Sequence, residues 1–464
     1  MTELERRLSI FKAYDVRGLV PTELDENVAY LTGRALAAFL APHRIVVGRD
    51  MRLSGERLAR ALTRGLVESG VDVIDIGEVG TEQVYFATFS LDLDGGVMVT
   101  ASHNPADYNG LKFVREKAIP ISGDTGLATL RESVEKALRG GGRPEPPAGA
   151  VSPGRIEHVD IRESYLEHLL GYVDVGALRP LRIVANGGGG MAGPIIARLR
   201  DRLPFEFILL QEQPDGTFPY GVPNPLLPEK RETTAQAVRE AGADLGLAWD
   251  GDFDRCFFFD EHGTFIEGYY LVGLLARQAL AKAPGATIVH DPRLVWNTRE
   301  VVEAAGGRPV VNKSGHAFIK ERMRREDAVY GGEMSAHHYF RDFSYCDSGM
   351  IPWLLVTEAM SISGSPLSEM VGEMMRRYPV SGEINLELAH PERALDRLQQ
   401  TYGPQALSVD EIDGVSLEFP DWRVNVRLSN TEPVLRVNLE SRGSEELTRR
   451  KTQEILAFLE EAGR

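Results

Sequence analysis

Three aspartates at alternate positions are the clearest sign of chemistry in this sequence. Asp250, Asp252 and Asp254 follow the apolar run Leu245–Trp249, which is typical of a buried strand. On an extended segment, side chains at positions i, i+2 and i+4 point to the same side. Three carboxylates so close together repel one another unless a cation lies between them. A hard divalent ion, Mg²⁺ by preference, is the expected occupant, with positions left open for phosphate oxygens.

An EF-hand calcium loop is the competing interpretation of this segment, because Glu261 falls at its twelfth position. The sixth position of an EF-hand needs glycine, and here it holds Arg255. The flanking runs Leu245–Trp249 and Cys256–Phe259 have the composition of strands rather than helices. We therefore favour a metal site on a strand-to-strand loop.

A hydroxyl beside an imidazole forms the second candidate site. Val97–Val99 predicts a short buried strand, and Asn104-Pro105 predicts a turn because the residue before proline is pushed out of the helical region. Ser102 and His103 then lie on a loop at the end of a strand. A hydroxyl next to a titratable group is a candidate nucleophile, and the alternative is a capping serine in an ordinary turn.

A third polar loop follows a later apolar strand near Ala328–Gly331. It contains Glu333, Ser335 and His337. A carboxylate close to a hydroxyl suits paired hydrogen bonds to neighbouring sugar hydroxyls, and the alternative is a capped turn.

A fourth polar loop lies between two predicted strands near the end of the chain. Ser429, Asn430 and Thr431 could converge on an anion, and Arg427 and Arg436 flank them with positive charge. The same residue types are common turn formers.

The elements that position these loops form an internal repeat. Three units open on an Ile-Val strand, at Ile45–Asp50, Ile183–Asn186 and Ile288–Asp291. Roughly 40 to 60 residues later, a second apolar strand runs into a polar loop. Alternating strands and helices predict α/β layers, in which ligands bind beyond the carboxyl ends of the strands.

The last part of the chain has another pattern. Arg423–Leu428 and Leu435–Glu440 alternate apolar and polar residues, as half-exposed antiparallel strands do, and a helix from about Ser444 to Leu459 covers their apolar face. Gly140–Gly154 is rich in glycine and proline and predicts a linker. We therefore expect an α/β protein with three similar mixed sheets and a smaller α+β domain with an antiparallel sheet, and the predicted domains are residues 1–153, 154–255, 256–370 and 371–464.

Composition narrows the classes of function. A chain of 464 residues is too long for one hydrophobic core, and its net charge of −16 argues against nucleic acid or an anionic membrane as partner. With two cysteines in the chain, we expect no disulfide framework. The polar start Met1–Arg7 shows no signal peptide, and the apolar run Tyr269–Ala283 is shorter than the roughly 20 residues that a bilayer needs. We expect a cytoplasmic protein.

Taken together, the four loops resemble the signature loops of the α-D-phosphohexomutase family. Thr100–Pro105, Asp250–Arg255, Gly332–His337 and Arg427–Thr431 occur in the family's order and span nearly the whole chain. The longer runs Gly332–Phe340 and Gly251–Cys256 are most similar to the bacterial phosphomannomutase and phosphoglucomutase branch. One departure is the turn Asn186–Gly190, which has more glycine than the family's usual turn. Since it lacks a phosphate-binding lysine and the G-x-G-x-x-G spacing, we interpret it as a tight turn.

The resemblance implies four domains around a central cleft and a set of residue roles. It implies a phosphoserine at Ser102 and Mg²⁺ held by that phosphate together with the three aspartates. The other implied roles are as follows: Glu333 and Ser335 bind the sugar O3 and O4; Arg427, Ser429, Asn430 and Thr431 hold the non-reacting phosphate; Arg17, His103 and Lys112 lie near the transferred proton and phosphoryl group; Arg255, Arg293, His316 and His337 line the substrate.

The reaction that the resemblance implies is the interconversion of mannose 6-phosphate and mannose 1-phosphate through a hexose 1,6-bisphosphate, which also serves as activator. The alternatives are a phosphoglucomutase or dual-specificity phosphohexomutase, a metal-dependent sugar phosphatase and, more distantly, a calcium-binding protein. His103 and Lys112 both remain candidates for the general base. The sequence leaves the oligomeric state open.

Overall fold

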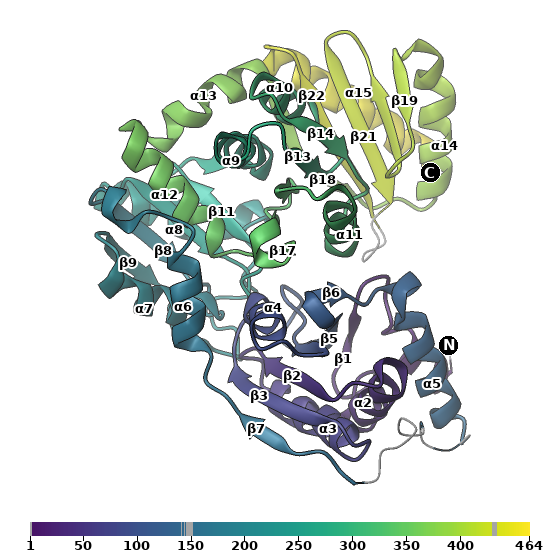
Figure 1. Ribbon diagram of the computed structural model, residues 1–464. Coiled ribbons are helices and arrows are strands. Elements are labelled where there is room, and N and C mark those ends of the chain that lie inside the picture. Colours follow the sequence, from purple (N-terminus) through teal and green to yellow (C-terminus); the bar gives the residue numbers. More distant parts are fainter. Residues whose placement is uncertain (1, 141, 143, 145–151, 429–433) are drawn as a thin grey trace. The chain divides into compact units, whose positions relative to one another are not determined.

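The computed structural model describes residues 2–140, 142, 144, 152–428 and 434–464 (Figure 1). The chain forms two compact units. Unit 1 contains residues 1–265 and 342–362, and unit 2 contains residues 266–341 and 363–464.

The first sheet of unit 1 has the strand order β1-β5-β4-β2-β3-β7, with β6 beside β5. Strand β2 runs parallel to β3 and β4, whereas β5 is antiparallel to β4. The strands are β1 (Val16–Leu19), β2 (Arg44–Arg49), β3 (Asp72–Glu78), β4 (Gly95–Val99), β5 (Tyr108–Arg115), β6 (Ile119–Pro120) and β7 (Ile156–His158). The helices are α1 (Glu3–Leu8), α2 (Glu26–Leu40), α3 (Gly55–Val67), α4 (Thr81–Ser90) and α5 (Leu127–Leu138).

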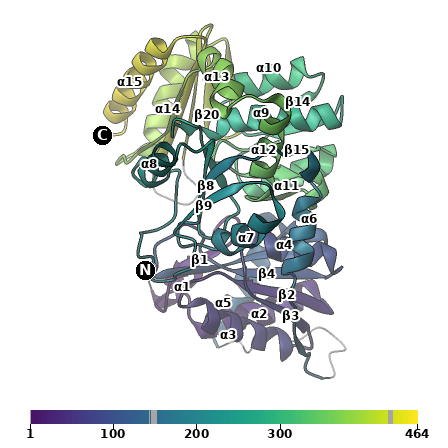
Figure 2. The same ribbon diagram turned by 90° about the vertical axis from the view of Figure 1, so that its left-hand side faces the viewer.

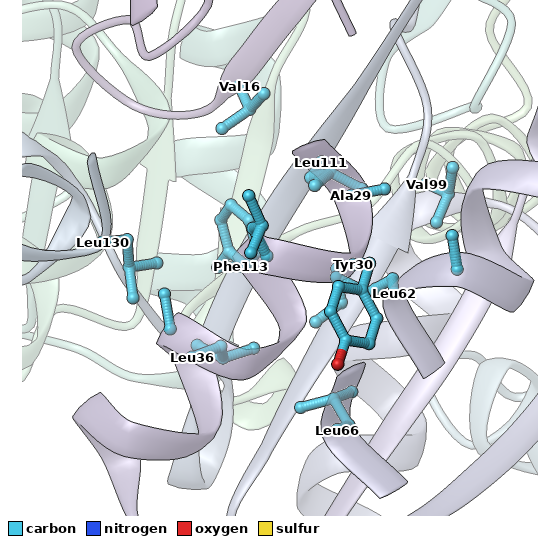
Figure 3. Close-up of a cluster of buried hydrophobic side chains, with 14 of the residues drawn as sticks. Val16, Ala29, Tyr30, Leu36, Leu62, Leu66, Val99, Leu111, Phe113 and Leu130 are labelled. Atoms are coloured by element: carbon cyan, nitrogen blue, oxygen red, sulfur yellow. The ribbon is translucent and has the colours of Figure 1, made fainter. Parts of the chain in front are cut away.

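Helices cover both faces of this sheet, which explains why every residue of β4 is buried. Figures 1 and 2 show α2, α3 and α5 on one face and α4 on the other. Helix α3 packs through Leu58, Leu62 and Leu66, which recur at helical spacing and are fully buried. Figure 3 shows Leu62 and Leu66 beside Tyr30 of α2 in the resulting core.

The second sheet of unit 1 contains the order β11-β10-β8-β9. Strand β8 runs parallel to β9 and β10, and β11 is antiparallel to β10. The elements are α6 (Arg162–Leu170), β8 (Arg182–Asn186), α7 (Ala192–Leu199), β9 (Glu206–Leu210), α8 (Glu232–Ala241), β10 (Leu245–Trp249) and β11 (Cys256–Phe259). Strand β17 (Cys346–Asp347) also lies in this unit, while β12 (Phe265–Ile266) and α12 (Ile351–Ser363) end one residue into unit 2.

Unit 2 contains the third sheet, with the order β14-β13-β15-β16. Strand β13 is parallel to β14 and β15, and β16 is antiparallel to β15. The elements are α9 (Gly268–Lys282), β13 (Thr287–His290), α10 (Trp296–Ala304), β14 (Arg308–Val311), α11 (His316–Glu326), β15 (Tyr330–Gly332), β16 (His338–Phe340) and α13 (Leu367–Arg377).

The fourth sheet, also in unit 2, is fully antiparallel with the order β18-β22-β21-β20-β19. Its elements are β18 (Val380–Leu386), α14 (Pro391–Tyr402), β19 (Ser408–Asp410), β20 (Val415–Glu418), β21 (Trp422–Leu428), β22 (Leu435–Ser441) and α15 (Glu445–Ala462). Alternate residues Val424 and Val426 of β21 enter one core with Leu398 of α14 and Leu459 of α15. The predicted α+β domain is thus confirmed.

The internal repeat is confirmed by the strand order of the first three sheets. In each sheet, the first strand of the repeat (β2, β8, β13) is flanked by two parallel strands. One of these (β4, β10, β15) pairs antiparallel with the strand that follows it in sequence (β5, β11, β16). The polar loop always connects that parallel strand to its antiparallel neighbour. Three chemically different loops therefore occupy the same topological position.

The predicted domain limits differ from the observed strand pairing. β7 lies beyond residue 153 but pairs with β3, and β11 lies beyond residue 255 but pairs with β10. The limit at residue 370 falls within α13. Composition marks flexible stretches, whereas the extent of a sheet depends on pairing between distant strands, which composition does not show.

Among the helices of the described residues, none is both long enough and apolar enough to cross a bilayer.

Close packing of α2 on α3 generates a stability prediction. A Cβ added at Gly65 would lie 2.2 Å from the carbonyl oxygen of Tyr30, so the helix backbones must separate in Gly65→Ala. We expect this variant to lose about 1–3 kcal/mol in free energy of unfolding, measured by urea denaturation followed by circular dichroism.

Gly372→Ala in α13 is the matched control. Its nearest atom would be Nη1 of the flexible Arg376 side chain at 3.3 Å, so we expect no loss and a gain of up to about 1 kcal/mol. A Gly65→Ala variant as stable as wild type would contradict the close helix contact.

Candidate active site

The loop after β4, residues 100–107, holds Ser102 in an unusual backbone conformation. Ser102 has a φ of 49°, in the left-handed region that costs a non-glycine residue energy. Its backbone N–H donates to the Thr100 hydroxyl over 2.9 Å, and the residue is only 3% exposed. The loop, which we call the serine loop, therefore fixes the direction of one side chain.

Ser102 contacts both of its predicted neighbours, Asp250 and His103. Its hydroxyl donates to Oδ2 of Asp250 over 2.9 Å, and its Oγ lies 3.1 Å from Nδ1 of His103. The nucleophile candidate of the first sheet thus contacts the aspartate loop of the second.

The extended geometry predicted for the three aspartates is wrong. Residues 250–255 form a turn between β10 and β11, and Phe253 adopts a φ of 46°. Folding of the turn, rather than strand alternation, brings the carboxylates together. The flanking strands confirm that the loop is not an EF-hand.

The aspartate turn fits a divalent cation. One ligand oxygen from each of Asp250, Asp252 and Asp254 lies within 4.8 Å of the others, and all three residues are buried. Among the described residues, Oδ1 of Asp252 is buried without a hydrogen-bond partner, so one carboxylate oxygen is open for coordination. Hard oxygen donors of this kind suit Mg²⁺.

Two cationic side chains neutralise the aspartate turn. Nζ of Lys112 lies 2.6 Å from Oδ2 of Asp252 and 2.7 Å from Oδ2 of Asp254. Nε and Nη2 of Arg255 donate to Oδ2 of Asp250 over 2.9 and 2.7 Å. Burial raises the pKa of Asp250 to about 7 despite the opposing charge of Arg255. Burial lowers the pKa of Lys112, but Asp252 and Asp254 outweigh it and hold the ammonium charged.

His103 lies among donors and positive charges. Nη2 of Arg255 is 2.7 Å from Nδ1 of His103. Burial first, and then the charges of Arg255 and Arg17, hold the pKa of His103 well below its usual value, so the imidazole is neutral at pH 7. Arg17, from β1, donates to Oδ1 of Asn104 over 2.7 Å and so reaches the serine loop.

The glycine-rich turn after β8 supports the aspartate turn instead of binding phosphate. Its N–H groups already have acceptors: Gly188 donates to Oδ1 of Asn186, Gly189 to the Gln211 carbonyl and Gly190 to the Gly187 carbonyl. A Cβ at Gly190 would lie 2.8 Å from the carbonyl oxygen of Gly251. The predicted tight turn is confirmed, and its glycines permit a close approach to the aspartate turn.

In unit 2, the loop between β15 and β16 contains Glu333, and both oxygens of its carboxylate accept a hydrogen bond. Its Oε1 accepts from the Gly315 N–H over 2.8 Å and its Oε2 from the Tyr339 hydroxyl over 2.5 Å. Oγ of Ser335 lies 3.2 Å from Nδ1 of His337. Glu333, Ser335 and His337 are therefore brought together, and His316 follows Gly315 at the start of α11.

Three arginines of unit 2 surround Glu383 of β18. Nη1 of Arg293 lies 3.1 Å from its Oε2, Nη2 of Arg427 lies 3.6 Å from the same oxygen, and Nη1 of Arg436 lies 3.5 Å from Oε1. Nη2 of Arg293 also donates to Oγ of Ser335 over 3.2 Å. One carboxylate thus joins the predicted sugar loop to the predicted anion loop.

Sequence reasoning missed Glu383, since a single glutamate in a strand carries no motif.

The structure groups the predicted residues into two sets. The set in unit 1 is Arg17, Ser102, His103, Lys112, Asp250, Asp252, Asp254 and Arg255; the set in unit 2 is Arg293, His316, Glu333, Ser335, His337, Arg427 and Arg436. The predicted phosphate contacts Ser429, Asn430 and Thr431 lie outside the described residues.

Family models match most of the chain. The models described as phosphoglucomutase/phosphomannomutase α/β/α domains I, II and III match residues 8–139, 163–263 and 267–378, and the model of the C-terminal domain matches residues 383–457.

Curated relatives and a solved structure agree with these matches. The chain is 55% identical to a phosphomannomutase of Escherichia coli K12, over 98% of this chain and 100% of the relative. It is 57% identical to a Xanthomonas campestris protein described as phosphohexose mutases, over 97% and 99%. A phosphoglucomutase/phosphomannomutase family protein of Burkholderia thailandensis has a similar structure, with a TM-score of 0.87 and 32% identity over 98% of both chains.

The arginine cluster around Glu383 generates a stability prediction. Burial raises the pKa of Glu383, but Arg293, Arg436 and Arg427 outweigh it and hold the pKa below its usual value. Glu383→Gln removes the charge that these guanidinium groups share, so we expect a loss of about 3 kcal/mol in free energy of unfolding at pH 7.

The pH dependence follows from the same shift. A carboxyl whose pKa is lower in the folded state stabilises the fold above its unfolded pKa, and this contribution disappears as the pH falls through the folded pKa. The stability difference between wild type and Glu383→Gln should therefore shrink below about pH 4.5 in urea unfolding. Glu387→Gln is the control, because Glu387 is exposed and directly follows β18; it should match wild type at pH 7 and below about pH 4.5. Equal stability of Glu383→Gln and wild type at pH 7 would contradict the cluster's role.

Proposed function

The chain belongs to the phosphoglucomutase/phosphomannomutase family, and we propose that it interconverts mannose 6-phosphate and mannose 1-phosphate through a phosphorylated Ser102. The observation that carries this proposal is the contact of the Ser102 hydroxyl with Asp250 at 2.9 Å and with His103 at 3.1 Å. A hydroxyl held between a carboxylate turn and an imidazole suits phosphoryl transfer, which depends mainly on positioning and on neutralising charge.

In the proposed reaction, phosphorylated Ser102 gives its phosphoryl group to the free hydroxyl of a hexose monophosphate. The O–P bond at Ser102 breaks, a new one forms at the sugar, and the sugar hydroxyl loses its proton to a base. The product is hexose 1,6-bisphosphate, which reorients and returns its other phosphate to Ser102. His103 and Lys112 are the candidates for the base, and His103 is the one whose ring nitrogen lies beside Ser102 Oγ.

Asp250, Asp252 and Asp254 would hold Mg²⁺ together with the serine phosphate. Such an ion supplies positive charge that offsets the charge of the transferred phosphoryl group. The open Oδ1 of Asp252 supports this assignment. Lys112 and Arg255 add fixed positive charge at the same turn.

The residues of unit 2 are proposed to recognise the substrate. Glu333 and Ser335 would bind the sugar O3 and O4, and Arg293 fixes Ser335 through its guanidinium. The remaining proposed contacts from unit 2 are His316 and His337 along the substrate and Arg427, Ser429, Asn430, Thr431 and Arg436 on the distant phosphate. From unit 1, Arg255 is also proposed to line the substrate.

Dual specificity is the second candidate function. The family description names both phosphoglucomutase and phosphomannomutase, and one relative is described as phosphohexose mutases. Glucose and mannose share O3 and O4, so contacts through Glu333 and Ser335 do not separate them. Parallel assays with both hexose 1-phosphates distinguish the two candidates.

Ser102→Ala tests the proposed function directly. We expect at least about a 10³-fold loss of turnover, because the alanine has no oxygen to carry the phosphoryl group. The measurement is phosphorus NMR of mannose 1-phosphate with a trace of the bisphosphate, which separates isomerised sugar phosphate from free phosphate.

Ser164→Ala on α6 is the control, since that hydroxyl donates to the Ile161 carbonyl of its own helix start and Ser164 is exposed. Near-normal activity of Ser102→Ala would exclude the phosphoserine. Release of free phosphate as the main wild-type product would favour a phosphatase instead.

Asp252→Asn tests the metal site. Loss of one ligand charge should weaken Mg²⁺ binding by more than roughly 10-fold, the loss typical when a residue that contacts a metal ligand, and not the metal, is mutated. The measurements are calorimetric titration and the Mg²⁺ dependence of turnover. Asp201→Asn, whose side chain is 83% exposed, should leave both unchanged. An unaltered Mg²⁺ dependence in Asp252→Asn would remove the aspartate turn from the metal site.

A further inference from the structure

Two buried charges after β2 have no part in the chemistry proposed so far. Asp50 is 1% exposed and Arg52 is 2% exposed. Burying a charge is costly unless hydrogen bonds and a partner compensate it. Their contacts therefore show what these residues hold in place.

Arg52 binds the backbone of the serine loop. Its Nη1 donates to the carbonyls of Pro105 and Tyr108 over 2.6 and 2.9 Å. Its Nη2 donates to the carbonyls of Ser102 and Asn104 over 2.8 and 2.6 Å. A guanidinium has four Nη protons, so these bonds use all of them. Arg52 thus has no Nη proton left for a substrate oxygen.

Asp50 connects Arg52 to the other side of Ser102. Its Oδ1 accepts from the Arg52 N–H over 3.0 Å, and its Oδ2 lies 3.3 Å from Nε of Arg52. The same Oδ2 accepts from the Thr100 hydroxyl over 2.6 Å, and that hydroxyl accepts from the Ser102 N–H over 2.9 Å. The N–H and the carbonyl of Ser102 are therefore both tied to the Asp50–Arg52 pair.

A residue of the second sheet's domain completes the enclosure of Arg52. The guanidinium carbon lies 5.0 Å from the centre of the Phe218 ring. A Cβ at the nearby Gly216 would lie 2.3 Å from the Met51 carbonyl oxygen, so the chain passes close against this segment. The Phe218 ring thus contributes to the enclosure of Arg52, which is 2% exposed.

The serine loop needs such a device because Ser102 occupies a costly conformation. A left-handed backbone costs a non-glycine residue about 1–2 kcal/mol and persists only where its surroundings enforce it. That conformation directs Oγ toward Asp250 and His103. A shift of about 1 Å in a reacting group lowers the rate by about 10²-fold.

We propose that Arg52, oriented by Asp50, is a positioning residue that holds the serine loop so that Ser102 faces Asp250 and His103. It acts on the rate of phosphoryl transfer and not on substrate binding. This role rests on the proposed mutase function.

Arg52→Lys is the primary test. A single ammonium with three protons cannot reach four carbonyls, so the loop loses part of its support while the positive charge remains. We expect kcat to fall by about 10²-fold with KM changed by less than about twofold. The rate at which hexose 1,6-bisphosphate phosphorylates Ser102, followed by intact-protein mass spectrometry, should fall in parallel. In Arg52→Ala, added guanidinium ion should raise kcat at least about fivefold. A variant that had only lost stability would show no such increase.

Arg34→Lys is the matched control for Arg52→Lys. Arg34 is also a buried arginine of the first sheet's domain, 9% exposed, but it contacts the Tyr30 hydroxyl and not the serine loop. We expect this variant to keep the wild-type kcat even where its melting temperature falls.

Thr100→Val provides a second test that spares both charges. It removes the hydroxyl link between Asp50 and the Ser102 N–H while keeping the shape of the side chain, and we expect a fall in kcat of about 10-fold at unchanged KM.

The outcomes separate the two proposals. An active wild type together with Arg52→Lys and Thr100→Val variants that retain kcat would overturn the positioning role. So would a raised KM at unchanged kcat, or an Arg52→Ala variant that guanidinium does not rescue. A wild type that produces no isomerised sugar phosphate would overturn the mutase function itself. In that case, amide hydrogen exchange of residues 102–108 still tests the positioning role, because Arg52→Lys should speed it and Arg34→Lys should not.

Discussion

The contact between the Ser102 hydroxyl and Asp250 is the interaction on which the site in unit 1 depends. It joins a loop of the first sheet to a turn of the second, and both parts need unusual backbone to make it: a left-handed Ser102 on one side and a left-handed Phe253 on the other. A Cβ at Gly251 would lie 2.8 Å from the Ser102 carbonyl oxygen, so even a methyl group would separate them. The glycine-rich turn behind the aspartates and the Asp50–Arg52 pair behind the serine loop both maintain this approach.

Charge compensation is the second constraint, and both units meet it in the same way. Three buried carboxylates in unit 1 lie against Lys112 and Arg255. In unit 2, Arg293, Arg427 and Arg436 lie against Glu383, and Asp291 and Asp413 add further negative charge. Neither group is stable in a protein interior without the other sign of charge close by. Such prearranged charge suits anionic substrates in a chain whose net charge is −16, because attraction must come from local clusters.

Much of the fold was predictable because local patterns and tertiary structure agree. The apolar runs at Val97–Val99 and Leu245–Trp249 form strands, the stripe Leu58, Leu62 and Leu66 forms the buried face of α3, and the alternation at Arg423–Leu428 forms an antiparallel strand. The limits of the sheets were less predictable. β7 and β11 join sheets by pairing with strands far away in sequence, and no local signal marks such a partner.

The sequence by itself indicated that the polar loops at Ser102, Asp250–Asp254 and Glu333–His337 follow strands, because periodicity and turn residues are local properties. It also determined family membership through the order of four loops. Only the tertiary structure decided that a turn, and not an extended strand, gathers the three aspartates. It alone placed Glu383 among three arginines and Arg52 on four carbonyls, since these contacts join residues from different strands and loops that nothing in the local sequence relates.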